Sequence, residues 1–579
     1  MSSLSHRIIH IWQHRHGFLL PVILFMLVAS VLAVWHINRF VAHTQAALSY
    51  RYPLDGQEGT LLHAARVLRS GEPLYQPLLP HQVIAAPYPP VHYVLLAALE
   101  YLTNPEEIVF NVTQRPIFQP GRLLSLTASV SVALLLALTV QRLGGSRIIG
   151  AVAGSLWLAF PSVQLWSTRI KADPLALAFT TVGLLAIAGY FTTERPAVCQ
   201  RRVTPALVIA AVAFALAFFT KQTLFAAPLA TTLTLLLTGH RKRSEPDTAA
   251  QPWKRLYQHL APGLTFGTLY TLLVVITWIS LDVITRGQYS FHVWGLHPPA
   301  WWTYGRLRKY IDLLLPAWPL MLLTGVSVGL TIRNELRWLV TLTQYQRHPV
   351  GTMHQLWLSD NLSATFMFCA SYGLLGTAAL VTAGTAGSHH NHLLEPQLAL
   401  TLAGCSVAGR SLAQLHANVA LQRLGLGLLA LMLVLAQLWI LRTRPAWYGG
   451  EFDLSEPAGE RFVALIMSQP GEILADDVGL ILAAGRTPRY NDPATMGPAI
   501  RSGLWDQRGL LADIAAQRFS LIILPFNIER FELDPMGRWS PECIAAIRQH
   551  YDLLYRDVMF SYIPGEHTEP FTAALHRSR

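Results

Sequence analysis

The stretch Tyr50-Arg-Tyr-Pro-Leu-Asp55-Gly-Gln-Glu58 follows the first hydrophobic run of the chain and opens a polar segment that ends in Pro87-Tyr-Pro-Pro90. It places two carboxylates just past a membrane helix, at the depth where the head group of a lipid would lie. A hydrophobic anchor alone does not need acids at this depth. An enzyme that acts on a membrane-embedded donor needs them, to take a proton or to hold a cation. The segment therefore favours a membrane enzyme.

The composition is typical of a polytopic membrane protein. The chain has 579 residues, of which 52% are hydrophobic and 13% are charged, and its mean hydropathy is +0.35. A helix needs about 20 apolar residues to cross the hydrocarbon core, and such runs recur to about Leu441. We expect a mostly α-helical transmembrane bundle of about eleven spans. The predicted spans are 18-38, 122-141, 147-166, 173-191, 204-220, 222-239, 262-284, 313-331, 364-384, 393-413 and 424-441.

Basic residues lie in the short loops that this topology places on the cytoplasmic side. The formal net charge is +11, but its distribution follows the positive-inside rule and does not indicate a nucleic-acid partner. We expect a multi-pass protein of the inner (plasma) membrane with a cytoplasmic amino terminus and an extracytoplasmic carboxyl terminus. The four cysteines have no CxxC spacing, which indicates neither a metal knuckle nor a disulfide framework. The basic groups are Arg142/Arg147, Arg195/Arg201/Arg202, Arg241-Lys-Arg243 with Lys254/Arg255, Arg333/Arg337/Arg347 and Arg410/Arg423.

Two further segments define the predicted domains. The apolar stretch Val91-Leu102 is too short to span and follows two prolines, so we expect a helix along the membrane surface. After Arg442 the hydropathy falls, and the patterns predict a small extracytoplasmic α/β domain. The predicted division is a transmembrane domain, 1-444, with a first extracytoplasmic loop at 39-121, and a soluble domain, 445-579. In the soluble domain the expected helices are 456-469, 507-517 and 541-551, and the expected strands are 472-476 and 520-525.

Charged and polar residues gather at the outward ends of the predicted spans. Asp55 and Glu58 would share one face of a helical turn, where either carboxylate could deprotonate a hydroxyl, although a helix cap would use the same residues. Lys221 lies between two apolar runs. An ammonium there needs water or an anion such as a lipid phosphate, unless it snorkels from a hairpin. The candidate catalytic residues are Asp55 and Glu58, and the candidate substrate-binding residues are Tyr88, Arg169, Lys171, Lys221, Gln222, His390, Asn391, His392 and Glu395.

Metal binding and helix capping are open alternatives at two of these places. Ser388-His-His-Asn-His392 with Glu395 offers imidazoles and a carboxylate, but the spacing fixes no third ligand. Hydrogen bonding to a sugar or a phosphate is the favoured interpretation, so no metal ligand is assigned, and a divalent cation is left open as a cofactor. Asp173 fits either a site carboxylate or an amino-terminal helix cap.

Taken in order over about 18-442, these motifs resemble those of the GT-C superfamily of lipid-dependent glycosyltransferases, which includes protein O-mannosyltransferases and aminoarabinose transferases. Asp55-Gly-Gln-Glu58 is similar to the Asp-Glu motif of that family's first extracytoplasmic loop, although two residues separate the acids here. Pro87-Tyr-Pro-Pro90-Val-His-Tyr93 resembles its Tyr-x-x-Pro-Pro-Leu-x-Tyr motif. Gly121-Arg122-Leu-Leu, Thr220-Lys221-Gln222 and Asn391-His-Leu-Leu-Glu395 resemble its Arg-Leu-Pro, Lys-Gln and Asn-Tyr-x-x-Glu segments, with His392 in place of an aromatic residue.

The resemblance implies a glycosyltransferase with an inverting mechanism. The donor would be a polyprenyl-phosphate sugar, and the acceptor a hydroxyl of a lipid, a glycan or a protein. The alternative is a transporter or flippase of lipid-linked sugars, which predicts polar residues inside several spans and an inverted repeat; the middles of these spans are nearly free of charge. The implied roles are proton acceptor for Asp55 or Glu58, phosphate neutralisation for Lys221 with Arg169 or Lys171, and orientation of the sugar or the phosphate for His390, Asn391 and Glu395.

Overall fold

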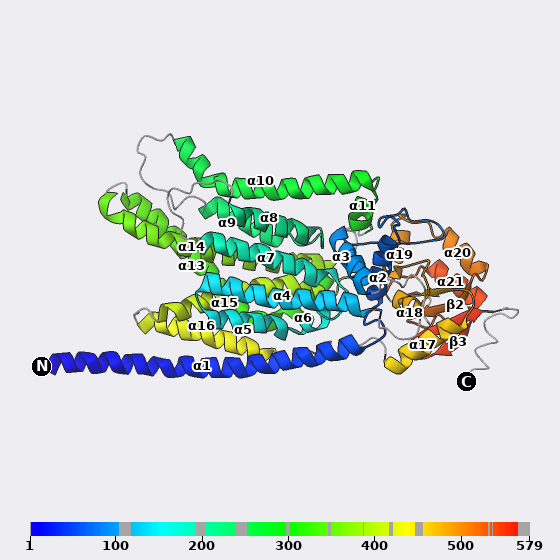
Figure 1. Cartoon of the computed structure of the whole chain (residues 1–579), viewed down its shortest axis with the longest axis horizontal. Helices are drawn as coiled ribbons and strands as arrows, with labels where there is room; N and C mark the ends of the chain where they lie inside the picture. Colours follow the sequence, from blue (N-terminus) through cyan, green and yellow to red (C-terminus); the bar gives the residue numbers. More distant parts are fainter. Residues whose placement is uncertain are drawn as a thin grey trace.

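The chain folds into a bundle of long helices with a small mixed domain at one end (Figure 1). The amino terminus lies at the other end of the bundle. These features come from a computed structural model, which describes residues 2–103, 117–192, 204–238, 252–296, 302–345, 349–385, 387–415, 421–445, 455–530, 533–534 and 536–565.

The helices of the bundle match the predicted spans in order and approximate position. Among the described residues, six helices are long and apolar enough to cross a membrane, and four shorter apolar helices accompany them. The chain is therefore a multi-pass membrane protein, while the count of eleven spans stays a prediction. The bundle helices are α1 (Ser2–Ser49), α4 (Gln119–Gly144), α5 (Arg147–Ala159), α6 (Pro161–Trp166), α7 (Ala172–Thr192), α8 (Pro205–Phe218), α9 (Ala226–Thr238), α10 (Pro252–Ile284), α12 (Tyr304–Leu314), α13 (Trp318–Tyr345), α14 (Pro349–Ala378), α15 (Leu394–Leu415) and α16 (Leu421–Ile440).

Prolines interrupt two of the predicted spans. The span expected at 147-166 is split into α5 and α6 because Phe160 has an extended backbone, with ψ 129°, before Pro161. The span expected at 313-331 is broken by a short 3-10 turn, Leu315–Ala317, that contains Pro316. A third difference concerns the turn between α8 and α9, which is longer than predicted and carries Lys221.

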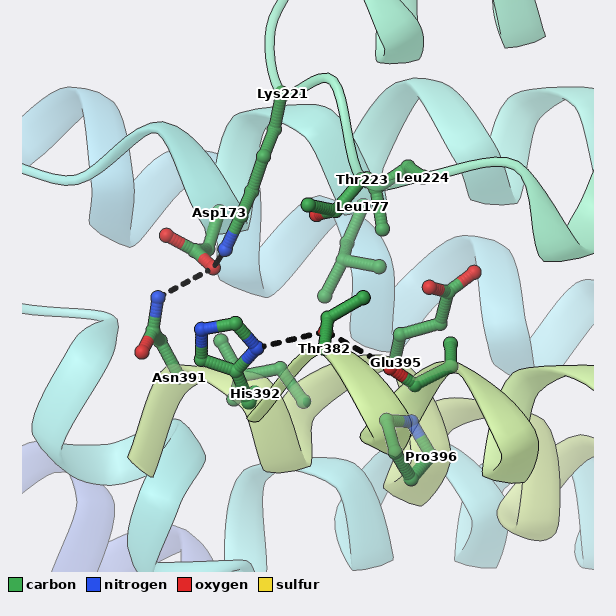
Figure 2. A pocket seen from close by; sticks show the side chains of 12 residues that line it. Asp173, Leu177, Lys221, Thr223, Leu224, Thr382, Asn391, His392, Glu395 and Pro396 are labelled. Atoms are coloured by element: carbon green, nitrogen blue, oxygen red, sulfur yellow. Dashed lines mark hydrogen bonds and ion pairs between the residues drawn. The ribbon is translucent and has the colours of Figure 1, made fainter. Parts of the chain in front are cut away.

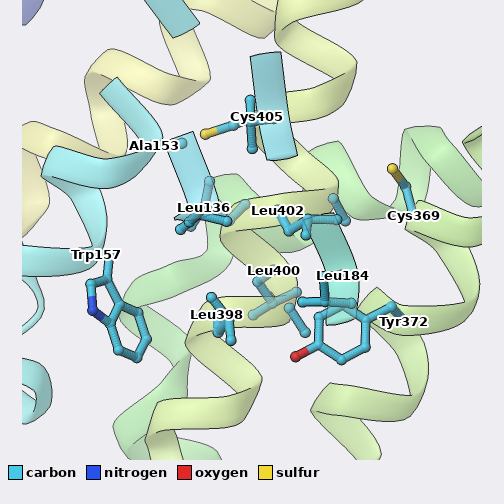
Figure 3. Close-up of a cluster of buried hydrophobic side chains, with 14 of the residues drawn as sticks. Leu136, Ala153, Trp157, Leu184, Cys369, Tyr372, Leu398, Leu400, Leu402 and Cys405 are labelled. Atoms are coloured by element: carbon cyan, nitrogen blue, oxygen red, sulfur yellow. The ribbon is translucent and has the colours of Figure 1, made fainter. Parts of the chain in front are cut away.

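Small residues let the central helices approach one another closely. A Cβ on Gly150 of α5 would lie 2.5 Å from the Ala137 carbonyl oxygen of α4, and one on Gly154 would lie 2.7 Å from that of Ala133. Such contacts stabilise membrane helices, which have no hydrophobic drive to associate in lipid. Around this contact lies the buried core of the bundle (Figure 3), to which Leu136, Trp157, Leu184, Tyr372, Leu398 and Leu402 belong.

The carboxyl-terminal domain contains a four-stranded sheet in the order β1-β2-β4-β3. β1 pairs with β2 in parallel, and the β2-β4 and β4-β3 pairs are antiparallel. The expected strands at 472-476 and 520-525 and the three expected helices are present within a few residues, but the β3-β4 hairpin was not predicted. The elements are α17 (Glu456–Ser468), β1 (Glu472–Ala475), α18 (Val478–Ala483), α19 (Pro493–Arg501), α20 (Arg508–Ala515), β2 (Phe519–Leu524), α21 (Pro541–His550), β3 (Tyr551–Arg556) and β4 (Phe560–Pro564).

The segment after α1 joins the bundle to this domain. It forms two helices, α2 (Gly56–Arg69) and α3 (Pro90–Thr103). α3 is the helix expected near Val91-Leu102, and it lies at the end of the bundle beside α2 (Figure 1). Asn491 of the domain ties down the strand-like stretch before α3, because its side chain accepts from Ala85 N at 2.7 Å and donates to Ala85 O at 3.1 Å. This contact fixes the stretch before α3 between the membrane helices and the domain.

Candidate functional site

Asp55 begins α2 and faces two cations. Its Oδ1 caps the helix by accepting from the backbone of Gln57 at 2.9 Å and of Glu58 at 3.2 Å. Its Oδ2 lies 3.1 Å from Lys171 Nζ and 3.5 Å from an Arg169 nitrogen. Both cations come from the connection between α6 and α7. The capping interpretation and the site interpretation of Asp55 therefore apply to different oxygens of the same carboxylate.

The surroundings of Asp55 keep it ionised. Burial alone would raise the pKa of Asp55, but Lys171 and Arg169 outweigh that effect and hold the pKa below its ordinary value. Lys171 also donates to Gln57 Oε1 at 2.6 Å. The ring of Trp166 faces both cations, with its centroid 4.8 Å from Lys171 Nζ and 5.4 Å from the Arg169 guanidinium carbon. Asp55 therefore presents a charged carboxylate whose position is fixed by several contacts.

Glu58 points away from this group and is fully buried. Its carboxylate accepts from Arg122 at 2.8 and 3.1 Å, from Leu54 N at 2.7 Å and from Ile170 N at 3.0 Å. The side chains of Glu58 and Arg122 have no exposed surface. Although only two residues separate Asp55 from Glu58, the two carboxylates face different partners. The contacts of Glu58 hold α2, α4 and the segment before α7 together.

A pocket lies between α7, the turn after α8 and the start of α15 (Figure 2). Lys221 extends from the turn to an ion pair with Asp173, in the first turn of α7, and Asn391 donates to the same carboxylate oxygen at 3.1 Å. His392 Nδ1 lies 3.0 Å from the Thr382 hydroxyl. The Glu395 carboxylate points into the same space. The pocket is partly open to its surroundings.

The Asp55 group and this pocket adjoin one another. The rings of Trp166 and His389 lie 6.2 Å apart, and Asn391 bonds to Asp173, so the segment before α7 runs beside the segment before α15. Tyr88 lies at the border. Burial raises the pKa of Tyr88, and the carboxylates of Asp173, Asp55 and Asp492 raise it further. Asp492, in the carboxyl-terminal domain, therefore affects the pKa of the same tyrosine as Asp55 and Asp173.

The histidines of the 388–392 segment are neutral at pH 7. Burial lowers the pKa of His389 and of His390 to about 4, with contributions from Lys171 at His389 and from His389 at His390. Burial, followed by Lys221, lowers the pKa of His392 to about 3. Among the residues that the structure describes, no group of three or more His, Cys, Asp or Glu side chains is arranged to hold a metal ion. A neutral imidazole can donate one hydrogen bond and accept another.

The structure groups most of the predicted site residues but separates two. Lys221, Asn391, His392 and Glu395 line the pocket, and Arg169, Lys171 and Tyr88 adjoin it. His390 lies beside these residues, where His389 and Arg169 influence its pKa. Glu58 lies in its own buried pair. Gln222 donates to the carbonyls of Pro87 at 3.3 Å and Val293 at 3.0 Å, which holds the loop in place.

Three further residues belong to the same region but were not candidates. Asp173 was weighed as a helix cap, yet its Oδ1 pairs with Lys221. Gln57 and Trp166 contact Lys171. A signal for Asp173 was present in the sequence, since it follows Arg169 and Lys171 just before a predicted span. No pattern marks Gln57 or Trp166, whose partners are distant in sequence.

Comparisons with known proteins identify the fold. No protein-family model and no curated protein match the chain. Among solved structures, the chain is similar to ArnT from Cupriavidus metallidurans bound to undecaprenyl phosphate, with a TM-score of 0.52 and 13% identity over 93% of this chain and 99% of that one.

Two other structures show weaker likeness. One is the archaeal oligosaccharyltransferase AglB from Archaeoglobus fulgidus in complex with an inhibitory peptide and a dolichol-phosphate. Its TM-score is 0.47 and its identity 10%, over 93% of this chain and 75% of that one. The other is the arabinofuranosyltransferase AftD from Mycobacteria, with a TM-score of 0.44 and 16% identity over 94% of this chain and 40% of that one. The chain has the GT-C fold, as the motifs predicted.

Proposed function

We propose that this GT-C-fold chain is an integral membrane glycosyltransferase that moves a sugar from a polyprenyl-phosphate donor to an acceptor hydroxyl at the extracytoplasmic face. The observation that carries the proposal is the adjacency of an ionised carboxylate, Asp55, to a polar pocket at the same end of the bundle. The ArnT structure with undecaprenyl phosphate supports a lipid-linked donor. A lipid, a glycan or a protein would supply the acceptor hydroxyl.

In the proposed mechanism Asp55 accepts the proton of the acceptor hydroxyl as that oxygen attacks the anomeric carbon. Lys171 and Arg169 hold the carboxylate in place and keep it charged. The bond from the anomeric carbon to the phosphate oxygen breaks, and Lys221 offsets the charge that develops on the departing phosphate. Attack from the opposite side of the ring would invert the anomeric configuration. Glu58 supports this arrangement by holding the start of α2 against Arg122.

Transfer can be tested with the full chain in proteoliposomes. A panel of radiolabelled polyprenyl-phosphate sugars is offered with extracted envelope lipids and glycans, and products are identified by mass spectrometry. We expect a glycosidic product with the unmodified protein and a loss of at least about a thousandfold in rate with Asp55→Asn, since the amide cannot accept the proton.

The control is Glu72→Gln, which changes an exposed carboxylate three residues after the end of α2. It should transfer at the normal rate. Movement of labelled lipid across the bilayer without any glycosidic product would favour the transporter alternative. Full activity of Asp55→Asn would remove Asp55 from the chemistry.

A further inference from the structure

The pocket around Lys221 presents oxygen atoms that have no hydrogen-bond partner among the described residues. These are Asp173 Oδ2, Asn391 Oδ1 and Glu395 Oε1. Asp173 is 3% exposed and Glu395 is 6% exposed. The orientation of the Asn391 amide follows from its contact with Asp173, because a carboxylate only accepts and the nitrogen must face it. Asp173 Oδ2 and Asn391 Oδ1 are therefore hydrogen-bond acceptors.

A buried acceptor without a protein partner takes its donors from water or from a bound ligand. A buried polar atom without a partner costs free energy, and functional sites are where such atoms occur. A phosphodiester offers only acceptor oxygens, so it cannot satisfy Asp173 Oδ2 or Asn391 Oδ1. The hydroxyl groups of a sugar are donors and can satisfy them. Leu177, Leu224 and Pro396 add apolar surface to the same pocket, against which the C–H face of a sugar ring can pack.

The charges of the pocket also favour a sugar without a carboxylate. The ammonium of Lys221 is already paired with the Asp173 carboxylate. A carboxylate on the ligand would add a like charge beside Asp173 at a buried place, where it is poorly screened. It would also offer only acceptor oxygens to Asp173 Oδ2 and Asn391 Oδ1.

From this geometry we infer that the pocket binds the sugar of the donor through its hydroxyl groups and selects an uncharged sugar over an acidic one. The inference rests on the proposed function and deepens it, since it assigns the sugar to the residues Asp173, Asn391 and Glu395. The phosphate would lie at the edge of the pocket, near the Lys221 ammonium.

Binding of matched lipids to the full chain in nanodiscs tests the inference. The probes are undecaprenyl phosphate, the same lipid carrying glucose or galactose, and the same lipid carrying glucuronic or galacturonic acid. We expect the unmodified protein to bind at least one uncharged sugar lipid about tenfold or more tightly than its acidic counterpart. Glu395→Gln should reduce that ratio by about tenfold, because the amide N–H groups that replace a carboxyl oxygen can donate to the carboxylate of an acidic sugar. The affinity for sugar-free undecaprenyl phosphate should stay within about twofold.

Control variants separate this effect from misfolding. Asn391→Ala should weaken the sugar lipids but not the sugar-free lipid. Thr401→Ala changes a buried hydroxyl of the same helix, α15, that bonds to the Gln397 carbonyl and does not line the pocket, and it should leave all affinities unchanged.

Three results would overturn the inference. The first is equal or tighter binding of the acidic lipids by the unmodified protein. The second is an unchanged ratio in Glu395→Gln, and the third is a parallel loss of affinity for the sugar-free lipid, which would place the phosphate at Glu395. Failure of the unmodified protein to bind any of the lipids would instead overturn the proposed function, and this inference with it.

Discussion

Asp55 keeps its negative charge because Lys171 and Arg169 lower its pKa by more than burial raises it. Such a carboxylate is a weak base, but it suffices when the hydroxyl becomes acidic as it bonds to the anomeric carbon. Lys171→Met removes the largest lowering influence, so the pKa of Asp55 should rise. We expect the unmodified enzyme to show no loss of ionised Asp55 between about pH 8 and pH 5. The variant should lose kcat/KM progressively as the pH falls through that range.

A pH profile of transfer measures this effect. Lys309→Met provides the matched control, because Lys309 is an exposed lysine of α12. Its profile should follow that of the unmodified enzyme. A profile of Lys171→Met that keeps the shape of the unmodified one would show that Lys171 does not set the charge of Asp55.

The buried Glu58-Arg122 pair makes a separate prediction about stability. Glu58→Gln leaves the Arg122 guanidinium without its counter-charge, while its bonds to the carbonyls of Ala47, Tyr50 and Tyr52 remain. Breaking one partner of a buried pair costs about 3 to 5 kcal/mol. We expect a lower Tm and a poorer yield of folded protein, with transfer per folded molecule largely retained. Thermal unfolding in detergent, combined with the transfer assay, measures both quantities.

Glu72→Gln, at an exposed position between α2 and α3, serves as the control and should keep the normal Tm. An unchanged Tm together with abolished transfer in Glu58→Gln would assign Glu58 to the chemistry instead. Glu58 would then be the proton acceptor, and Asp55 would have the structural role.

Residue chemistry could be predicted from the sequence better than residue pairing. The costs of charge near lipid identified Asp55, Lys171 and Lys221 as groups that need partners. The partners of the two acids are distant in the sequence. Arg169 lies 114 residues after Asp55, and Arg122 lies 64 residues after Glu58. Local sequence patterns do not indicate such distant contacts. The sequence therefore could not predict that the carboxylates of Asp55 and Glu58 face different partners.

At the scale of elements, the close contact of α2 with α18 fixes where Asp55 lies. A Cβ on Gly59 would lie 2.2 Å from Gly479 N, which is backbone and cannot move aside cheaply. We expect Gly59→Ala to force α2 away from α18, to destabilise the protein by about 1 to 3 kcal/mol, and to lower transfer. The measurements are Tm, limited proteolysis and transfer rate.

Gly56→Ala tests the same helix without the clash, since nothing lies within 4 Å of a Cβ at Gly56. Its Tm should be normal or slightly raised. Equal stability of the two alanine variants would mean that the α2-α18 contact does not constrain the fold.

Helices and strands could be predicted from local sequence patterns where one face was clearly apolar. β1 and β2 are buried and apolar and were predicted. β3 alternates between buried or half-buried and exposed residues at the edge of the sheet, and its sequence Tyr-Asp-Leu-Leu-Tyr-Arg shows no alternation of residue type. The hairpin of β3 and β4 was missed for that reason. The break at Phe160-Pro161 was missed because apolar residues continue on both sides of Pro161, so that the whole stretch had the length of a span.

At the scale of the whole molecule, the carboxyl-terminal domain lies at one end of the bundle (Figure 1). The polar pocket, which includes Asp173, adjoins Tyr88, and Asp492 of that domain influences the pKa of this tyrosine. The amino terminus lies at the other end, with the loop between α4 and α5. The sequence could predict this separation because basic residues mark one end of each span pair and polar motifs mark the other. It could not predict how Asn491 joins the domain to the loop before α3, since that contact spans 406 residues.

The predicted orientation across the membrane can be tested by labelling single cysteines. The native cysteines are first replaced, and either Glu72→Cys, at the domain end, or Arg147→Cys, at the opposite end, is added; both positions are exposed. We expect a membrane-impermeant maleimide to label Glu72→Cys in intact cells. It should label Arg147→Cys only after the membrane is opened, because the basic loops are retained in the cytoplasm. The reverse pattern would invert the orientation and move the proposed transfer to the cytoplasmic face. Labelling of both variants from one side would contradict a bundle that separates these two ends.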